Sequence, residues 1–195
     1  MIRITKAKFC FSIKDFTVSY PDSDIPEIAI AGKSNVGKSS LINYLTSNSK
    51  LAYVSKQPGK TRLVNYFLLN DSFYLVDLPG YGYAKVSKKE KISWAEMMNG
   101  YFSASPNTKL LVILLDIRHD PSDDDIQMIN WAQNCGSPFL VVLTKADKVA
   151  KSKRNNCIAH MKKVIHAEED YPMIAVSSKD KIGKDELLSL MERFL

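Results

Sequence analysis

Eight consecutive residues near the N-terminus have the types and spacing needed to hold phosphate groups. The segment GKSNVGKS occupies residues 32–39 and follows an apolar run at 28–31. Its glycines allow a tight turn whose N–H groups point at phosphate oxygens, while Lys38 reaches the outer phosphates and the Ser39 hydroxyl can ligate Mg²⁺. A helix that begins near Gly37 adds the positive end of its dipole. We therefore predict a phosphate-binding P-loop for a nucleoside triphosphate.

A second group of residues has the chemistry to select the base. The tetrapeptide TKAD at 144–147 follows the apolar run 139–144. The carboxylate of Asp147 can accept hydrogen bonds from both N1–H and the amine of guanine, whereas adenine would place an acceptor against it at a large cost. The stem of Lys145 can lie over the purine, and a backbone N–H from 177–178 can reach the guanine O6. Such a tetrapeptide alone also occurs in surface turns, but together with the P-loop it favours a guanine nucleotide.

A third motif, DLPG at 77–80, suits the metal and the terminal phosphate. Asp77 can hold Mg²⁺ through a water, and the backbone of Gly80 can approach the terminal phosphate and release it after hydrolysis. Thr61 is the candidate second hydroxyl ligand, although it is also an ordinary residue for a strand start. We therefore predict Mg²⁺ ligands at Ser39, Thr61 and Asp77, and catalytic roles for Lys38, Thr61 and Gly80.

These motifs lie between alternating strand-like and helix-like segments, which predicts an α/β fold. The spacing at 70–72 is that of a hairpin, so one strand should run antiparallel. Residues 8–18 either add an edge strand or cover the core, and the acidic residues 123–125 favour a helix start rather than a metal site. We expect a P-loop NTPase G domain with a mixed, mostly parallel six-stranded sheet and helices on both faces. The predicted strands are 28–31, 63–69, 73–77, 110–116, 139–144 and 173–176, and the predicted helices are 38–45, 88–102, 122–134, 153–166 and 184–194.

Composition places the chain among ordinary globular proteins. The 195 residues, 45% of them hydrophobic, suffice for one domain. The longest aliphatic run, 110–115, is too short to cross a bilayer and no signal segment is evident, so we expect a cytoplasmic protein without membrane contact. Three widely spaced cysteines without a CxxC pair indicate reduced thiols. The net charge of +6 fits either an anionic partner or solvated lysine-rich faces.

Five stretches together resemble the EngB-type GTPases, in the TrmE-Era-EngA-EngB-septin-like branch. They are GKSNVGKSSLIN, PGKTR, DLPGYGYAKVSK, DIRHDPSDDDIQM and TKADK. The resemblance runs over nearly the whole chain from Pro26 and implies an N-terminal extension at 1–25 and a G domain at 26–195. It also implies a monomeric, Mg²⁺-dependent GTPase that assists assembly of the large ribosomal subunit and is needed for normal cell division and septation.

Carried onto this sequence, the resemblance implies that GTP or GDP contacts five segments. The residues are Gly32, Lys33, Ser34, Asn35, Val36, Gly37, Lys38, Ser39 and Ser40, then Gly59, Lys60, Thr61, Arg62 and Leu63, then Asp77, Leu78, Pro79 and Gly80, then Thr144, Lys145, Ala146 and Asp147, and finally Val176, Ser177 and Ser178.

Two residues, Tyr81 and Asn35, bear on the rate of GTP hydrolysis. Tyr81 stands where Ras-like enzymes carry a water-orienting glutamine, so unassisted hydrolysis should be slow. Asn35 occupies the position at which some relatives hold K⁺, which would raise turnover. The alternative is that Asn35 only braces the loop by hydrogen bonding.

The partner leaves two function hypotheses open. In the first, a GTP-dependent switch docks on ribosomal RNA and proteins of the large subunit through an aromatic and basic surface. That surface comprises Tyr81, Tyr83, Lys85, Lys88 and Lys89. The tyrosines could equally pack against the domain. In the second, the chain is a nucleotide-gated binding module for a cell-division protein, and hydrolysis is incidental.

Overall fold

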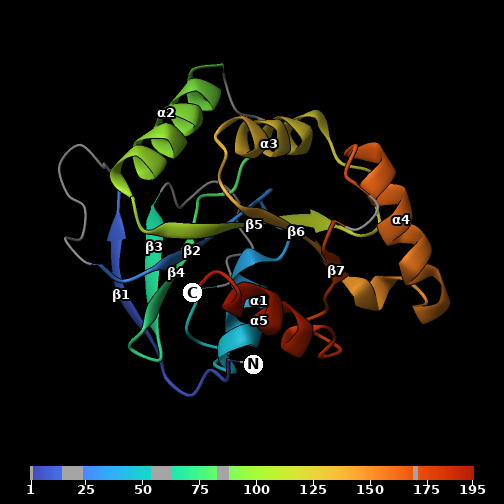
Figure 1. Cartoon of the computed structure of the whole chain (residues 1–195), viewed down its shortest axis with the longest axis horizontal. Helices are drawn as coiled ribbons and strands as arrows, with labels where there is room; N and C mark the ends of the chain where they lie inside the picture. The colour runs from blue at the N-terminus through green and yellow to red at the C-terminus, as the bar shows by residue number, and fades with distance from the viewer. Residues whose placement is uncertain (1, 15–23, 54–62, 83–87, 169–170) are drawn as a thin grey trace.

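A seven-stranded sheet runs through the centre of the molecule, and helices cover both of its faces (Figure 1). The computed structural model describes residues 2–14, 24–53, 63–82, 88–168 and 171–195, with the backbone alone for 88–95. The strands are β1 Ala7–Ile13, β2 Glu27–Gly32, β3 Val64–Leu69, β4 Phe73–Asp77, β5 Thr108–Asp116, β6 Phe139–Thr144 and β7 Met173–Ala175. The helices are α1 Lys38–Thr46, α2 Lys88–Ala104, α3 Asp123–Asn134, α4 Arg154–Val164 and α5 Lys184–Glu192, with short 3₁₀ turns η1 Ala146–Lys148 and η2 Lys151–Lys153.

The order across the sheet is β1-β3-β4-β2-β5-β6-β7. Strand β2 pairs in parallel with β4 and β5, and β6 and β7 continue the parallel part. Strand β3 is antiparallel to β4, as the short connection predicted. Asn70 and Asp71 both have positive φ angles in this hairpin, a conformation that these two residue types tolerate.

The prediction of six strands is wrong by one, because β1 forms a seventh at the edge. It pairs antiparallel with β3 from Ala7 to Ile13, with a register shift between Phe9 and Phe11. Such an irregularity breaks the alternation of inward and outward side chains. Phe9, Phe11 and Ile13 do recur with a period of two in the sequence, but Phe9 is exposed and only Ile13 is fully buried, so the sequence left an edge strand as one of two alternatives for this segment.

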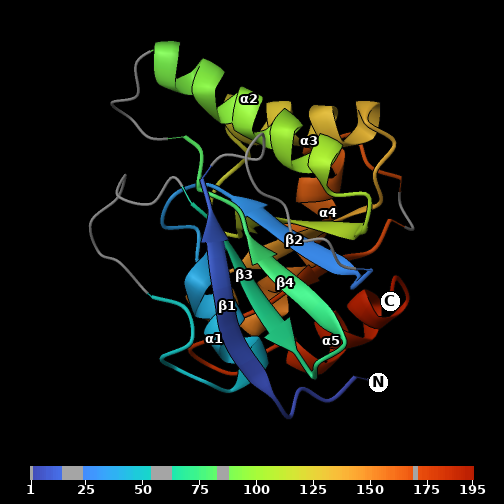
Figure 2. The same cartoon turned by 90° about the vertical axis from the view of Figure 1, so that its left-hand side faces the viewer.

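Two cores, one on each face, hold the layers together. Helices α2, α3 and α4 cover one face, and α1 and α5 cover the other (Figures 1 and 2). Strand β5 divides its side chains between them by alternation: Leu111 and Ile113 join the first core, and Val112 and Leu114 join the second. A strand buried on both faces is a continuous aliphatic run, which is why 110–115 could be predicted as a central strand.

The helices begin within one residue of the predicted positions, and their ends differ from the prediction by at most two residues. Helix α3 starts with a capping box in which Ser122 and Asp125 satisfy each other's backbone N–H groups. The prediction that the acidic residues 123–125 favour a helix start rather than a metal site is thus supported for Asp125. Among the helices that the structure describes, none combines the length and the apolar character needed to span a bilayer.

Candidate functional site

The P-loop leaves the carboxyl end of β2 and leads directly into α1. Gly37 has a φ of 119° and precedes a helix whose start is capped by no side chain. A Cβ on Gly32 would lie 2.9 Å from Val36 Cγ1 and 3.0 Å from the Leu114 carbonyl oxygen, so the loop packs closely on β5. The first N–H groups of α1 are therefore available to an anion, as the glycine spacing predicted.

Lys38 and Asp77 form a charged pair of groups beside the loop. Lys38 Nζ donates to the Gly32 carbonyl oxygen at 3.2 Å. Burial lowers the pKa of Lys38, and Asp77 opposes this shift. Burial also raises the pKa of Asp77 to about 6, against the effect of Lys38. Each charge is thus costly without a further ligand, a common property of functional sites.

Gly80 lies against the same cluster. A Cβ at this position would come within 2.8 Å of Lys38 Nζ and 3.0 Å of the Ser34 backbone nitrogen. The DLPG segment thus lies directly against the P-loop, and its two middle residues, Leu78 and Pro79, are buried. Only a glycine allows the backbone to come this close, because any side chain would meet the P-loop backbone.

The described residues fit a magnesium ion at this position. Asp77 Oδ1 is buried and has no hydrogen-bond partner among the residues that the structure describes. A carboxylate oxygen and a serine hydroxyl are hard ligands of the kind that Mg²⁺ prefers. Ser39 follows Lys38 in the first turn of α1, with Ser40 after it. The third predicted ligand, Thr61, lies outside the described residues.

The base-recognition segment follows β6 and lies beside the loop that follows β7. The Ser177 hydroxyl donates to Asp147 Oδ1 at 2.8 Å, and the Ala146 N–H donates to the Val176 carbonyl oxygen at 3.0 Å. Burial alone would raise the pKa of Asp147, but the Ser177 hydrogen bond and nearby lysines lower it on balance. Asp147 is therefore a fixed, charged acceptor, and Ser178 is exposed next to it.

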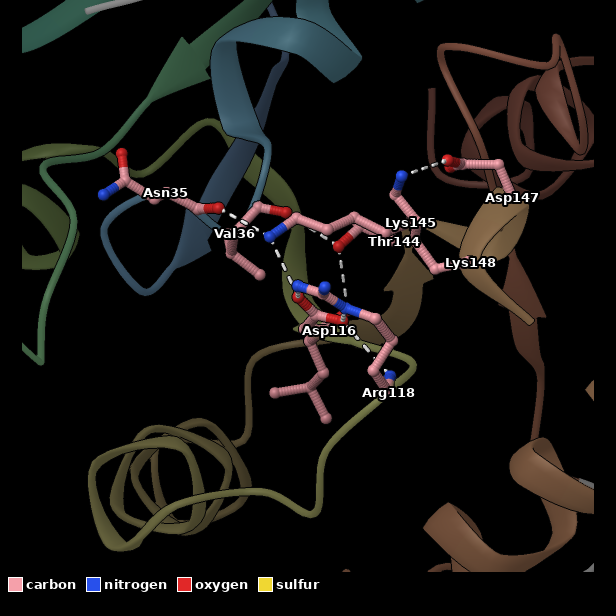
Figure 3. Close-up of polar contacts among 9 residues, drawn as sticks. Asn35, Val36, Asp116, Arg118, Thr144, Lys145, Asp147 and Lys148 are labelled. Carbon is pink, nitrogen blue, oxygen red and sulfur yellow. Dashed lines mark hydrogen bonds and ion pairs between the residues drawn. The ribbon is translucent and has the colours of Figure 1, made fainter. Parts of the chain in front are cut away.

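Two donors join this segment to the P-loop (Figure 3). The Thr144 hydroxyl donates to the Val36 carbonyl oxygen at 2.7 Å, and Lys145 Nζ donates to the Asn35 carbonyl oxygen at 2.9 Å. The two acceptors are consecutive residues of the loop. The base-recognition segment and the phosphate loop are thereby held in a fixed relation.

Comparison with known proteins decides the family. A family model described as 50S ribosome-binding GTPase matches residues 27–145. A probable GTP-binding protein EngB from Lactobacillus helveticus is 50% identical over 174 residues, 89% of each chain. The protein of the same description from Pelotomaculum thermopropionicum is 43% identical over 194 residues, which cover 100% of this chain and 98% of that one. The chain belongs to the EngB family of GTP-binding proteins.

Solved structures support the same fold for this EngB-family chain. The crystal structure of a probable GTP-binding protein EngB has a TM-score of 0.71 at 22% identity, covering 86% of this chain and 97% of that one. Era in complex with MgGDPNP and a segment of 16S ribosomal RNA has a TM-score of 0.67 at 22% identity, covering 88% of this chain and 57% of that one. The predicted G-domain fold is confirmed.

In this EngB-family chain, the stretches DLPGYGYAKVSK and DIRHDPSDDDIQM meet next to the P-loop. Lys33 pairs with Tyr81 in an isolated bridge, and the Ser34 N–H donates to the Tyr81 carbonyl oxygen at 3.0 Å. Lys33 Nζ donates to the Ser122 hydroxyl at 2.8 Å. A Cβ at Gly82 would lie 3.2 Å from Asp124 Oδ2. The P-loop, the segment after DLPG and the start of α3 therefore form one connected unit.

Tyr81 is not part of an exposed aromatic surface, which corrects that prediction. Its side chain is 6% exposed and belongs to the core cluster that includes Met128 and Ile129 of α3. Burial, with the carboxylates of Asp125 and Asp124, raises the pKa of this phenol far above its usual value. The alternative that the tyrosines pack against the domain is correct for Tyr81.

Several predicted residues cannot be placed in the site. Leu63 is half-buried just before β3, but Gly59, Lys60, Thr61 and Arg62 lie outside the described residues, as do Tyr83 and Lys85. Lys88 and Lys89 begin α2, where the structure describes the backbone alone. Their assigned contacts stay predictions, and the exposed side chain of Asn35 leaves both interpretations of that residue open.

Two residues of the site escaped the sequence reasoning. Asp116 ends β5 and forms an ion pair with Lys145 at 2.9 Å, and Arg118 binds the same carboxylate at 2.7 Å. The signal was available: a charged residue directly after an aliphatic strand emerges at the carboxyl edge, where α/β proteins bind ligands. The motif DIRHDP carried that residue, but it was assigned no chemical role.

Proposed function

We propose that this GTP-binding protein is a slow GTP-hydrolysing switch that assists assembly of the large ribosomal subunit. The observation that carries the proposal is the double connection between the base-recognition segment and the P-loop through Thr144 and Lys145. It holds a candidate guanine acceptor and a candidate phosphate cradle at one sheet edge. The description of the matching family, 50S ribosome-binding GTPase, supports the choice of partner.

The residues of the site have separable tasks under this proposal. Asp147 accepts from the guanine base, and the first N–H groups of α1 with Lys38 hold the phosphates. Ser39 and Asp77, with Thr61, would hold Mg²⁺, which when bound neutralises charge on the phosphate oxygens. Gly80 offers its N–H to the terminal phosphate, so that loss of this phosphate releases the segment.

Slow hydrolysis follows from the position of Tyr81. Its ring lies in the core against α3, so it does not take the place of a water-orienting glutamine. We expect the protein to persist in its GTP form until a partner accelerates hydrolysis. A monomeric, cytoplasmic protein with a role in ribosome assembly would also account for a requirement in normal cell division and septation.

Sedimentation with ribosomal subunits tests the partner. The protein is centrifuged with purified large subunits in GDP and in a non-hydrolysable GTP analogue, and we expect co-sedimentation mainly with the analogue. Reversing the charge at Lys88 and Lys89 should weaken it and leave nucleotide affinity unchanged, because basic groups near the switch contact RNA phosphates. The matched control reverses Lys8 and Lys14, which are exposed on and just after β1.

The outcomes separate the hypotheses. Equal co-sedimentation in both nucleotides would contradict the switch, and none in either would favour a binding module for another partner. Failure of the protein to prefer guanine over adenine nucleotides in a competition assay would remove the nucleotide assignment itself.

A further inference from the structure

The carboxylate of Asp116 is a shared acceptor for two cations at the edge of the base site (Figure 3). Arg118 Nε donates to Oδ1 at 2.9 Å and an Arg118 terminal nitrogen donates to Oδ2 at 2.7 Å, so the pair is bidentate. Lys145 Nζ contacts the same Oδ2 at 2.9 Å. Burial alone would raise the pKa of Asp116, but the hydrogen bonds from Arg118 and Lys145 hold it well below its usual range. The carboxylate therefore stays charged and fixed.

Lys145 is consequently held at both ends. Its backbone has a φ of 61° at the start of η1, and its ammonium lies between Asp116 and the Asn35 carbonyl oxygen. A lysine side chain has many rotamers, and this freedom is lost, at an entropy cost, when the side chain is ordered. If the stem is already extended where the purine must lie, that cost is met before the ligand binds.

Arg118 contributes orientation rather than fold stability. Its side chain is 39% exposed, and ion pairs of this kind add little to the free energy of unfolding. Its planar fork, however, fixes the plane of the Asp116 carboxylate, which a single ammonium cannot do. Without the fork, the carboxylate can rotate and Lys145 loses its anchored position.

We propose that Asp116 and Arg118 are positioning residues for guanine-nucleotide binding, and that they act by holding Lys145 extended beneath the purine. The inference rests on the proposed function, since it concerns the same site. It assigns a role in nucleotide affinity to a pair that acts through Lys145.

The main test is the Arg118→Met variant, which keeps the apolar stem and removes the fork. Its Kd for a fluorescent GDP should rise about tenfold, because most of the entropy cost of ordering Lys145 would then fall on the binding step. Arg118→Lys should recover only part of this loss, because it restores the charge without the bidentate geometry. Arg193→Met, which removes an exposed arginine after α5, is the matched control and should bind GDP as the unmodified protein does.

A double-mutant cycle tests whether Arg118 acts through Lys145. In a Lys145→Met background, adding Arg118→Met should change the GDP Kd by less than about twofold, since the side chain that it positions is absent. The same tenfold loss in both backgrounds would overturn the proposal, as would no loss in either.

Inorganic pyrophosphate gives a second readout that does not depend on the Lys145 variant. As a competitor without a base, it should bind Arg118→Met and the unmodified protein equally, and the thermal unfolding midpoint without nucleotide should be unchanged. A loss of pyrophosphate affinity equal to that of GDP would show a general disturbance of the site and overturn the inference. If the unmodified protein does not prefer GDP to ADP, the proposed function fails instead.

Discussion

The side chain of Asp147 is oriented before any ligand arrives. Ser177 donates to one of its oxygens, and Lys148 lies 3.7 Å from the other. These contacts keep it charged while leaving acceptor capacity for adjacent donors. Under the proposed function, the choice of guanine would depend on this one carboxylate, whose surroundings stabilise its ionised form.

Replacing Asp147 by Asn should abolish the preference for guanine. The amide would place a donor against the N1–H or the amine of guanine, so the GDP Kd should rise by about 100-fold or more, and xanthosine diphosphate should bind better than GDP. Competition against a fluorescent nucleotide measures both effects.

The exposed Asp185 in the first turn of α5 is the control position for this change. Asp185→Asn should leave all nucleotide affinities unchanged. An Asp147→Asn protein that still favoured guanosine over adenosine nucleotides would contradict the base assignment.

Three elements that are distant in sequence are joined around Lys33. The P-loop meets the segment after DLPG through the Ser34 N–H and the Tyr81 carbonyl oxygen, and meets the start of α3 through Lys33 and Ser122. Ser122 also donates to Asp125, its partner in the capping box. These hydrogen bonds connect the P-loop directly to the start of α3.

Replacing Lys33 by Met should loosen this connection. The variant loses a charge-assisted hydrogen bond in a half-buried setting, so the free energy of unfolding should fall by about 1–2 kcal/mol. Amide exchange at residues 122–126 should become faster, because the start of α3 loses the hydrogen bond from Lys33. Urea unfolding and hydrogen exchange measure the two effects.

Lys109→Met, at an exposed position of β5, is the comparison variant and should change neither quantity. If exchange at residues 122–126 were equally slow in Lys33→Met, the hydrogen bond between Lys33 and Ser122 would contribute nothing to the stability of that helix start.

At the scale of the whole molecule, a buried structural anchor and the proposed nucleotide site lie at opposite ends of the strands. At the amino end of β2, opposite the P-loop, the buried side chain of Glu27 accepts hydrogen bonds from Tyr101 at 2.8 Å and Ser105 at 2.9 Å. These groups fasten the end of α2 to the sheet. The described residues that we propose to bind nucleotide lie at the carboxyl edge, so we expect that the anchor and the proposed site can be altered independently.

Replacing Glu27 by Gln should therefore destabilise the fold without weakening nucleotide binding. Both hydroxyl groups donate to Oε2, and the neutral amide oxygen of Gln would accept them without the help of a charge. The free energy of unfolding should therefore fall by about 2 kcal/mol, seen as a lower urea midpoint. The GDP Kd should change by less than about twofold because the sites are well separated.

Glu168→Gln, an exposed position after α4, should leave the urea midpoint where it is. A marked loss of GDP affinity in Glu27→Gln would show that the two ends of the sheet are coupled after all.

Much of the architecture was predictable because its signals are local. The aliphatic run at 110–115 and the short connection at 70–72 follow from burial and chain geometry alone, and the glycines of the P-loop follow from phosphate chemistry. The seventh strand was left as one of two alternatives, because the half-exposed apolar residues of an edge segment do not reveal whether its backbone pairs with the sheet or only covers the core. Tyr81 was assigned to a surface because its position after a glycine-rich turn gives no sign of which way the ring points.

By itself, the sequence determined which chemical groups the site contains: a glycine-bounded anion loop, a lysine, and a carboxylate that can choose guanine. These depend on residue type and short spacing, which the chain encodes directly. Only the tertiary structure decided that Asp116 and Arg118 support Lys145, and that Lys33 joins Ser122 across 89 positions of the chain. Such contacts arise because parallel strands bring their carboxyl ends to one edge, a consequence of the folded sheet rather than of any local pattern.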